Sequence, residues 1–270
     1  SGHTAVVLKD RFLCVFGGVK RKSPETQSEA VTELALLDLE KAQWLDVHDA
    51  LEHEPAPRIR ATMTEMNYGI AVLVGGQSFS GPGTGTPFDE MWELSFTEAR
   101  PHFISCEWQK KVTSGAQTLG ARSCHCAVKA PCGLVVIGGV GPEGRVLPCE
   151  AYVFKDSTWH LPIQSGVFPP QGALHHACFR NGHVILIGGL DDANLQRRGL
   201  GRHTDVYLLN VEAWNWERLL RHELTPQIHA RSAMLDFGGQ VLIVGGDFGS
   251  QSAQSDFVAV LDIDASLNSA

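Results

Sequence analysis

FLCVFGG, residues 12–18, is a short apolar run that closes with a glycine pair, and the same pattern returns four more times. The later copies read IAVLVGG, LVVIGG, VILIGG and VLIVGG. The pairs are Gly17, Gly18, Gly75, Gly76, Gly138, Gly139, Gly188, Gly189, Gly245 and Gly246. Self-similarity at a period of 50 to 63 residues, counted between first glycines, indicates a repeat architecture.

Each repeat predicts four short β-strands. A segment of small and polar residues, such as ATMTEM, leads through a turn into the run that ends in the glycine pair. After a variable loop comes an alternating segment that begins with an acid, such as EMWELSF. Short runs rich in Val, Ile and Leu between Gly, Asn and Asp are typical of strands. Four units then carry a tryptophan where the outermost strand is expected, at Trp44, Trp108, Trp159 and Trp216. Four antiparallel strands at this period predict one blade of a β-propeller.

The unit resembles the kelch repeat, whose hallmarks are the double glycine, an aromatic residue in the third strand and a later tryptophan. The aromatic residues here are Trp92, Tyr152 and Tyr207. A glycine pair at the end of a buried strand permits close backbone approach or a positive φ angle. The resemblance implies an all-β, kelch-type β-propeller with five recognisable four-stranded blades. For function it is weakly specific, because propellers host many unrelated activities.

We expect a single domain over residues 1–270. Its approximate blades are 1–56, 57–118, 119–169, 170–227 and 228–270. The last unit stops after its third strand and has neither the fourth strand nor the tryptophan. Since propellers leave only short protected edges, we expect these blades to belong to a propeller of six or more.

Composition excludes some function classes. A formal net charge of −8 argues against broad nucleic-acid binding, and no run of 18 apolar residues predicts a membrane span. The seven cysteines share no repeat position, which favours reduced thiols in the cytoplasm or nucleus. Secretion stays open, because the chain begins at Ser1 without a methionine.

Binding residues are predicted in the loops between second and third strands, because loops on a rigid scaffold carry recognition. Arginine and lysine there suit an acidic peptide or a phosphate backbone. The alternative is solvated charge, neutralised by neighbouring acids. The candidates are Lys20, Arg21, Lys22, Gln77, Phe79, Arg145, Arg197, Arg198, Arg202 and His203.

Further arginines and histidines recur just before the innermost strands. Arg58, Arg60, Arg122 and Arg231 suit either an anion site at the channel mouth or hydrogen bonds to carbonyls between blades, and we favour the second. Repetition of His3, His125 and His175 at one phase likewise indicates scaffolding.

No catalytic, cofactor or metal site is predicted. The densest cluster is Cys124-His125-Cys126 with Cys132. Alternate strand residues point to opposite faces, so this cluster does not gather on one ion, and paired CxxC spacing is absent. No nucleophile elbow, P-loop or dinucleotide fingerprint is present.

A second resemblance concerns ATMTEMNYGIAVLVGG and the stretch from GGVGPEGRVLPCEAYVF through LHHACFRNGHVILIGGL. These segments are similar to the C-terminal kelch region of the leucine-carboxyl-methyltransferase-type enzymes of wybutosine synthesis. The resemblance implies an accessory domain that guides tRNA to a separate S-adenosylmethionine-dependent domain. The leading hypothesis is a module that binds a protein partner, and an enzyme in its own right is the weakest.

Overall fold

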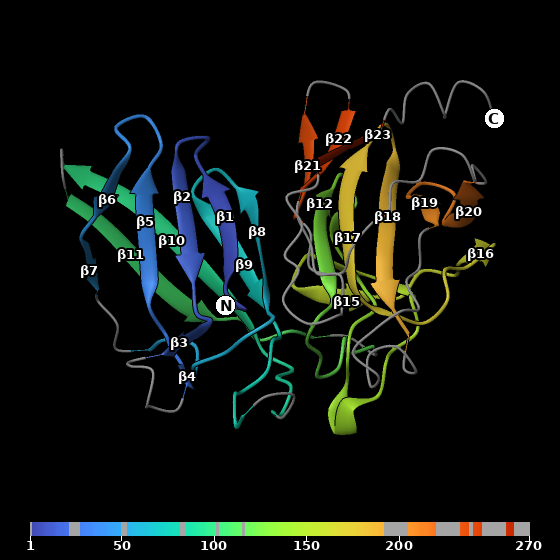
Figure 1. The fold of residues 1–270 in the computed structure, drawn as a ribbon, viewed down its shortest axis with the longest axis horizontal. Coiled ribbons are helices and arrows are strands. Elements are labelled where there is room, and N and C mark those ends of the chain that lie inside the picture. The colour runs from blue at the N-terminus through green and yellow to red at the C-terminus, as the bar shows by residue number, and fades with distance from the viewer. Residues whose placement is uncertain are drawn as a thin grey trace.

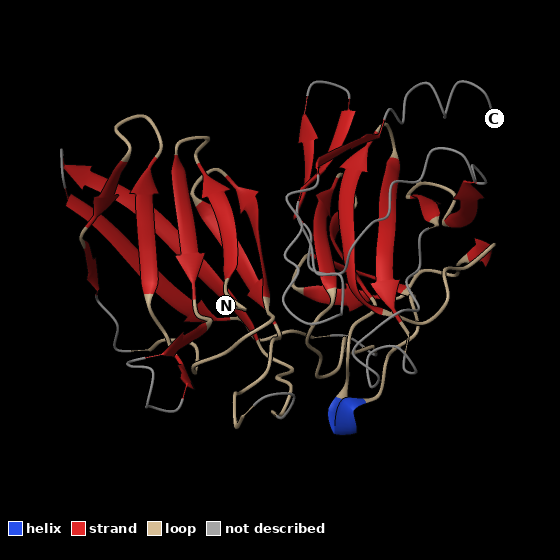
Figure 2. Ribbon diagram, in the orientation of Figure 1, coloured by secondary structure: helices blue, strands red, loops and turns tan. Residues whose placement is uncertain are grey.

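The computed structural model describes residues 2–21, 28–49, 53–81, 85–100, 103–114, 117–191, 205–219, 233–237, 240–244 and 258–261. Successive short strands form separate sheets, each with an antiparallel body built from one sequence repeat (Figures 1 and 2). No described helix is long and apolar enough to cross a membrane. The all-β prediction is confirmed.

The first blade is a four-stranded sheet with its strands in sequence order. It contains β1 (Thr4–Leu8), β2 (Phe12–Phe16), β5 (Leu34–Asp38) and β6 (Gln43–Leu45). A separate hairpin, β3 (Val19–Arg21) with β4 (Ser28–Ala30), lies in the loop between β2 and β5. The second and third strands are therefore joined by a structured loop.

The next blades repeat this order. The second holds β8 (Thr62–Asn67), β9 (Ile70–Val74), β10 (Met91–Arg100) and β11 (Phe103–Lys110). The third holds β12 (Cys126–Ala130), β13 (Gly133–Ile137), β14 (Ala151–Lys155) and β15 (Thr158–His160). The fourth holds β17 (Ala173–Arg180), β18 (His183–Leu190), β19 (Val206–Asn210) and β20 (Asn215–Leu219). In the described residues the fifth has three strands, β21 (Ala233–Phe237), β22 (Gln240–Val244) and β23 (Val258–Leu261).

The blades follow one another as in a propeller. The innermost strands contact in chain order: β1 meets β8, β8 meets β12, β12 meets β17, and β17 meets β21. This succession confirms the kelch-type propeller architecture.

Segments that leave one blade also pair with the outer edge of the next. β7 (Val47–Asp49) runs parallel to β11, and β16 (Ser165–Gly166) runs parallel to β20. Between the second and third blades the same role falls to one parallel bridge, Ser114 to Thr158. These parallel additions, which we call exit segments, tie neighbouring blades together at the outer rim.

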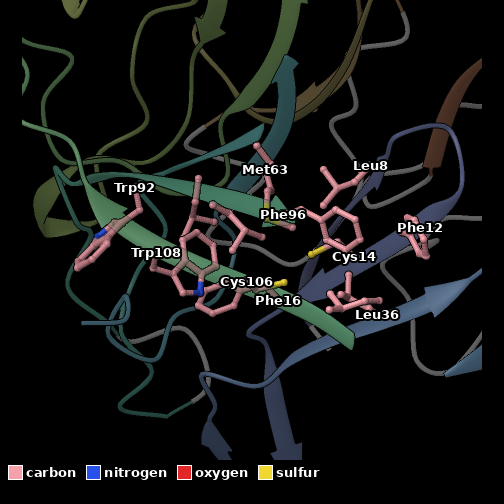
Figure 3. Close-up of a cluster of buried hydrophobic side chains, with 14 residues drawn as sticks. Leu8, Phe12, Cys14, Phe16, Leu36, Met63, Trp92, Phe96, Cys106 and Trp108 are labelled. Carbon is pink, nitrogen blue, oxygen red and sulfur yellow. The ribbon is translucent and has the colours of Figure 1, made fainter. Parts of the chain in front are cut away.

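The hydrophobic core lies between blades. In the first interface Phe16 packs against Trp108, with ring centroids 4.9 Å apart (Figure 3). Trp159 and Trp216 belong to the corresponding cores of the second and third interfaces. These three tryptophans are 5%, 5% and 0% exposed, whereas Trp44 is 58% exposed. The predicted tryptophan position is thus an inter-blade position, and Trp44 in the first blade has no blade packed over it in the described residues.

The glycine pairs are explained by the same interfaces. The second glycine donates its N–H to a backbone carbonyl that precedes the next inner strand: Gly18 to Arg58 at 3.0 Å, Gly76 to Arg122 at 2.9 Å, and Gly139 to Gly172 at 3.0 Å. A Cβ on Gly17 would lie 2.7 Å from the Arg58 oxygen. Both glycines of the four described pairs also have positive φ. Only glycine meets both demands at low cost.

A belt of backbone hydrogen bonds joins the inner strands near their first residues. Arg60 donates its N–H to the Gly2 carbonyl at 2.9 Å, Cys124 to Arg60 at 3.1 Å, and Leu174 to Cys124 at 2.8 Å. All four residues have φ between 56° and 77°. Left-handed backbone is unfavourable for the non-glycine members, so the belt holds them in a strained conformation.

Candidate functional site

The loops between second and third strands gather at one end of the molecule, which we call the loop end. Figure 1 shows the β3–β4 hairpin and the short helix η1 (Pro142–Gly144) at the lower end of the view. The tight β1–β2 and β17–β18 turns lie at the opposite, upper end. The two ends therefore differ: one carries long loops and the other carries short turns.

Lys20 stands on the β3–β4 hairpin, and its ammonium is paired with Glu33 at 2.6 Å. Both side chains are more than half exposed. Exposed pairs of this kind contribute little stability, so Lys20 stays accessible to a ligand. The backbone of Arg21 lies in β3, whereas Lys22, Arg197, Arg198, Arg202 and His203 lie outside the described residues.

Gln77 begins the second of these loops and is buried. Its Oε1 accepts a hydrogen bond from Ser123 Oγ at 2.6 Å, and its backbone pairs twice with Ile59 at 2.9 Å. These bonds anchor the loop to the neighbouring inner-strand segments. Phe79, two residues on, is half-buried.

Arg145 follows η1 in the third loop. Its backbone closes a turn, because Gly141 donates to its carbonyl at 2.8 Å. The side chain is exposed, and the described residues offer its guanidinium no hydrogen bond or ion pair. Arg145 stays a predicted binding residue.

Arg58 is fully engaged within the scaffold. It is buried, and its guanidinium donates to Ala56 O at 3.0 Å, to Gly75 O at 2.9 Å and to Glu90 at 2.7 Å. Burial alone raises the pKa of Glu90, but hydrogen bonds from Lys110, Arg58 and Trp92 lower it to about 2. The carboxylate is thus ionised and held within the blade.

Arg122 has the corresponding position one blade later. Its Nη1 donates to Gly138 O at 3.1 Å, its Nη2 to Leu119 O, and its guanidinium lies 5.0 Å from the ring centre of Tyr152. Burial lowers the pKa of Arg122 to about 10, so the side chain is still charged at neutral pH. Arg58 and Arg122 are therefore scaffold residues, as the sequence favoured.

Arg60 differs from these two. It is half-buried in the belt at φ 58°, and the described residues offer its guanidinium neither a hydrogen bond nor an ion pair. Strained non-glycine residues often mark functional sites. The sequence placed Arg60 in a group with Arg58, and the structure separates them by backbone conformation and by the partners of the Arg58 guanidinium.

The histidines and cysteines show no metal-binding arrangement among the described residues. Burial raises the pKa of the Cys149 thiol to about 12, and burial also raises the pKa of Cys14 and Cys126. Such thiols are poor nucleophiles and poor metal ligands at neutral pH.

Gln164 is a residue whose role sequence reasoning missed. It immediately precedes the exit segment β16, and its Oε1 accepts hydrogen bonds from Trp216 Nε1 at 2.9 Å and from Ala151 N at 3.0 Å. Its Nε2 donates to Ala151 O at 3.2 Å. A glutamine that follows Pro162 by two residues, in a short connecting segment, carries no distinctive sequence signal.

Comparison with known proteins agrees with this architecture. A family model described as the KLHDC2/KLHL20/DRC7 Kelch-repeats domain matches residues 2–246. An F-box/kelch-repeat protein of Arabidopsis thaliana is 29% identical over 162 residues, covering 53% of this chain and 31% of that protein. The chain thus aligns with about a third of that relative's length, and the resemblance to wybutosine enzymes stays a prediction. The chain belongs to the kelch-repeat family.

Proposed function

We propose that this domain binds an extended, acidic segment of a partner protein at the loop end, with Arg60 as the central cation. Kelch-repeat domains are in general protein-interaction modules. The binding site that we propose joins Arg60 in the belt with Arg145 and Lys20 on the surrounding loops. No step of chemistry is required of it.

The observation that carries the proposal is the contrast between Arg60 and its neighbours. Arg58 donates hydrogen bonds to the Gly75 carbonyl and to Glu90, and Arg122 donates to the Gly138 carbonyl. Arg60, only two residues from Arg58, keeps all its guanidinium donors unused within the described structure. A planar guanidinium with free donors favours a carboxylate, which it binds through two parallel hydrogen bonds.

The loops supply the variation that specificity needs. One is a β-hairpin, one is pinned by Gln77, and one contains a short 3₁₀ helix. The blades hold these loops in place, and each loop presents different side chains near Arg60. This arrangement suits a ligand that crosses several blades.

A peptide-display selection tests the proposal. A random peptide library is selected on the wild-type domain alone, and the affinities of the enriched peptides for the wild type and for Arg60→Gln are measured by fluorescence polarisation. We expect acidic peptides whose affinity falls about 10-fold or more in Arg60→Gln, since one charge-assisted hydrogen bond contributes about 1.5–3 kcal/mol.

Lys129→Gln is the matched control. Lys129 is an exposed cation near the last residue of β12, where the chain enters the β12–β13 turn. The substitution should leave the affinity unchanged, and Arg145→Gln should weaken it less than Arg60→Gln does. Equal affinity for wild type and Arg60→Gln would contradict the proposal.

The accessory role in tRNA modification is the second candidate. Its support is the basic residues Arg197, Arg198 and Arg202, which lie outside the described structure. It predicts tRNA binding that weakens steeply with salt and is lost when these arginines are neutralised. Absence of tRNA binding at low salt would remove that candidate without affecting the first.

A further inference from the structure

A buried histidine bridges the second and third blades. His125 precedes β12, is 5% exposed, and its Nε2 lies 2.8 Å from Thr62 Oγ1 at the start of β8. Its ring is enclosed by backbone that has no side chain: a Cβ on Gly75 would lie 3.1 Å from His125 Cε1. A Cβ on Gly139 would lie 3.0 Å from His125 Cβ. The His125 side chain is therefore closely packed between the two blades.

The joint also contains two buried nitrogens without a hydrogen-bond partner in the described structure, His125 Nδ1 and Arg122 Nε. Arg122 is itself 4% exposed and positively charged. The thiols of Cys124 and Cys126 flank His125 in sequence, and both are buried. Facing it from β8 is the uncharged hydroxyl of Thr62. Arg122 is the charged group whose field acts on the ring.

The joint between the first and second blades provides an internal comparison. It has the same glycine-pair bond, Gly18 to Arg58, and the same belt bond, Arg60 to Gly2. At the position of His125 it has Ala61, which precedes Thr62 just as His125 precedes Cys126. The two joints thus share their backbone bonds, and the second has a buried histidine where the first has Ala61.

We propose that the joint between the second and third blades is a proton-sensitive latch, closed while His125 is neutral and favoured to open when its ring is protonated. A proton on the ring would place an imidazolium in a buried site beside the Arg122 guanidinium. Two like charges out of water repel strongly. Opening the joint relieves this repulsion by giving His125 access to solvent.

The direction of the pH effect follows from linkage. Burial first, and then the charge of Arg122, lower the pKa of His125 from 6.5 to about 3. The opened joint exposes the ring and restores the ordinary pKa, so the open state binds more protons between pH 6.5 and 3. The closed joint is therefore fully stable above about pH 6.5 and loses stability as the pH falls. Between pH 7.5 and 5.0 the open population rises about 30-fold.

The latch has one consequence for ligand binding. The Arg60 carbonyl accepts the Cys124 N–H across this joint, so opening would free the belt at Arg60. We expect weaker ligand binding at pH 5, a consequence that rests on the proposed function. The latch itself does not depend on it.

Amide hydrogen exchange, resolved by residue and corrected for intrinsic rates, tests the latch without a ligand. From pH 7.5 to 5.0 the protection factors of Gly76 and Cys124 should fall about 30-fold. Those of Gly18 and Arg60 should change far less. The joint at Leu174 is not a control, since His175 and His176 lie beside it.

His125→Gln should remove the pH dependence at Gly76 and Cys124, because glutamine can bond to Thr62 but does not titrate. Thr62→Val should lower protection at both pH values while keeping the ratio. An equal pH response at both joints, or an unchanged response in His125→Gln, would overturn the latch.

Discussion

At the scale of single residues, the first glycine of each pair can be tested for its close contact with a backbone carbonyl of the next blade. Gly138 has φ 65°, and a Cβ there would lie 2.6 Å from the Gly172 carbonyl of the next blade. Gly120 has a similar φ of 74°, but a Cβ there would have no atom within 4 Å. An alanine at Gly120 would therefore meet only backbone strain, whereas an alanine at Gly138 would meet the strain and the close carbonyl as well.

Gly138→Ala should destabilise the domain by about 3 kcal/mol, since left-handed backbone costs about 1–2 kcal/mol and the carbonyl contact adds to it. Gly120→Ala should cost only the strain, about 1 kcal/mol. Urea unfolding of both variants measures the difference. Equal losses would show that close approach between blades is not what requires the first glycine.

The sequence offered close backbone approach or a positive φ as the reason for the glycine pairs, and the structure shows both; it also favoured scaffold roles for Arg58 and Arg122. These predictions succeed because each residue repeats at one phase, so a shared structural cause is visible in the pattern. Arg60 is different. Its left-handed φ accompanies bonds to Gly2 and from Cys124, which come from other repeats. Such a conformation cannot be read from local sequence.

At the scale of elements, the exit segments connect blades in a way that hairpin patterns do not reveal. β16 has only two residues, and its partner β20 lies about 50 residues later. Strand signals depend on runs of four or more residues with turn residues between them. A short parallel pairing over that distance has no such signal, so the sequence predicted four strands per blade and missed the added fifth.

Gln164 shows what these segments contribute. Its side chain holds Trp216 Nε1 and both backbone groups of Ala151. Gln164→Ala should cost about 2–4 kcal/mol, because it leaves a buried indole N–H and buried backbone groups unpaired.

Ile163→Ala is the control from the neighbouring position in the chain, since Ile163 is 96% exposed. Its effect should stay within about 0.5 kcal/mol. Thermal unfolding of the two variants provides the comparison, and equal stabilities would mean that the exit segment does not anchor the fourth blade.

At the scale of the whole molecule, the repeats place two different surfaces at opposite ends. The inner-strand belt and the glycine pairs fix the blades, and the long loops are left at one end. Five of the ten predicted binding residues have described backbone, and they lie in this loop end: Lys20, Arg21, Gln77, Phe79 and Arg145. Their role in binding stays a prediction, because no pattern within one chain specifies a partner.

The most direct test is the footprint of a selected acidic peptide, measured by hydrogen exchange at one pH. We predict new protection at Arg60 and in residues 77–81 and 140–150, and none at the turns 9–10, 67–69 and 181–182. Protection at those turns with none at the loop end would contradict the account.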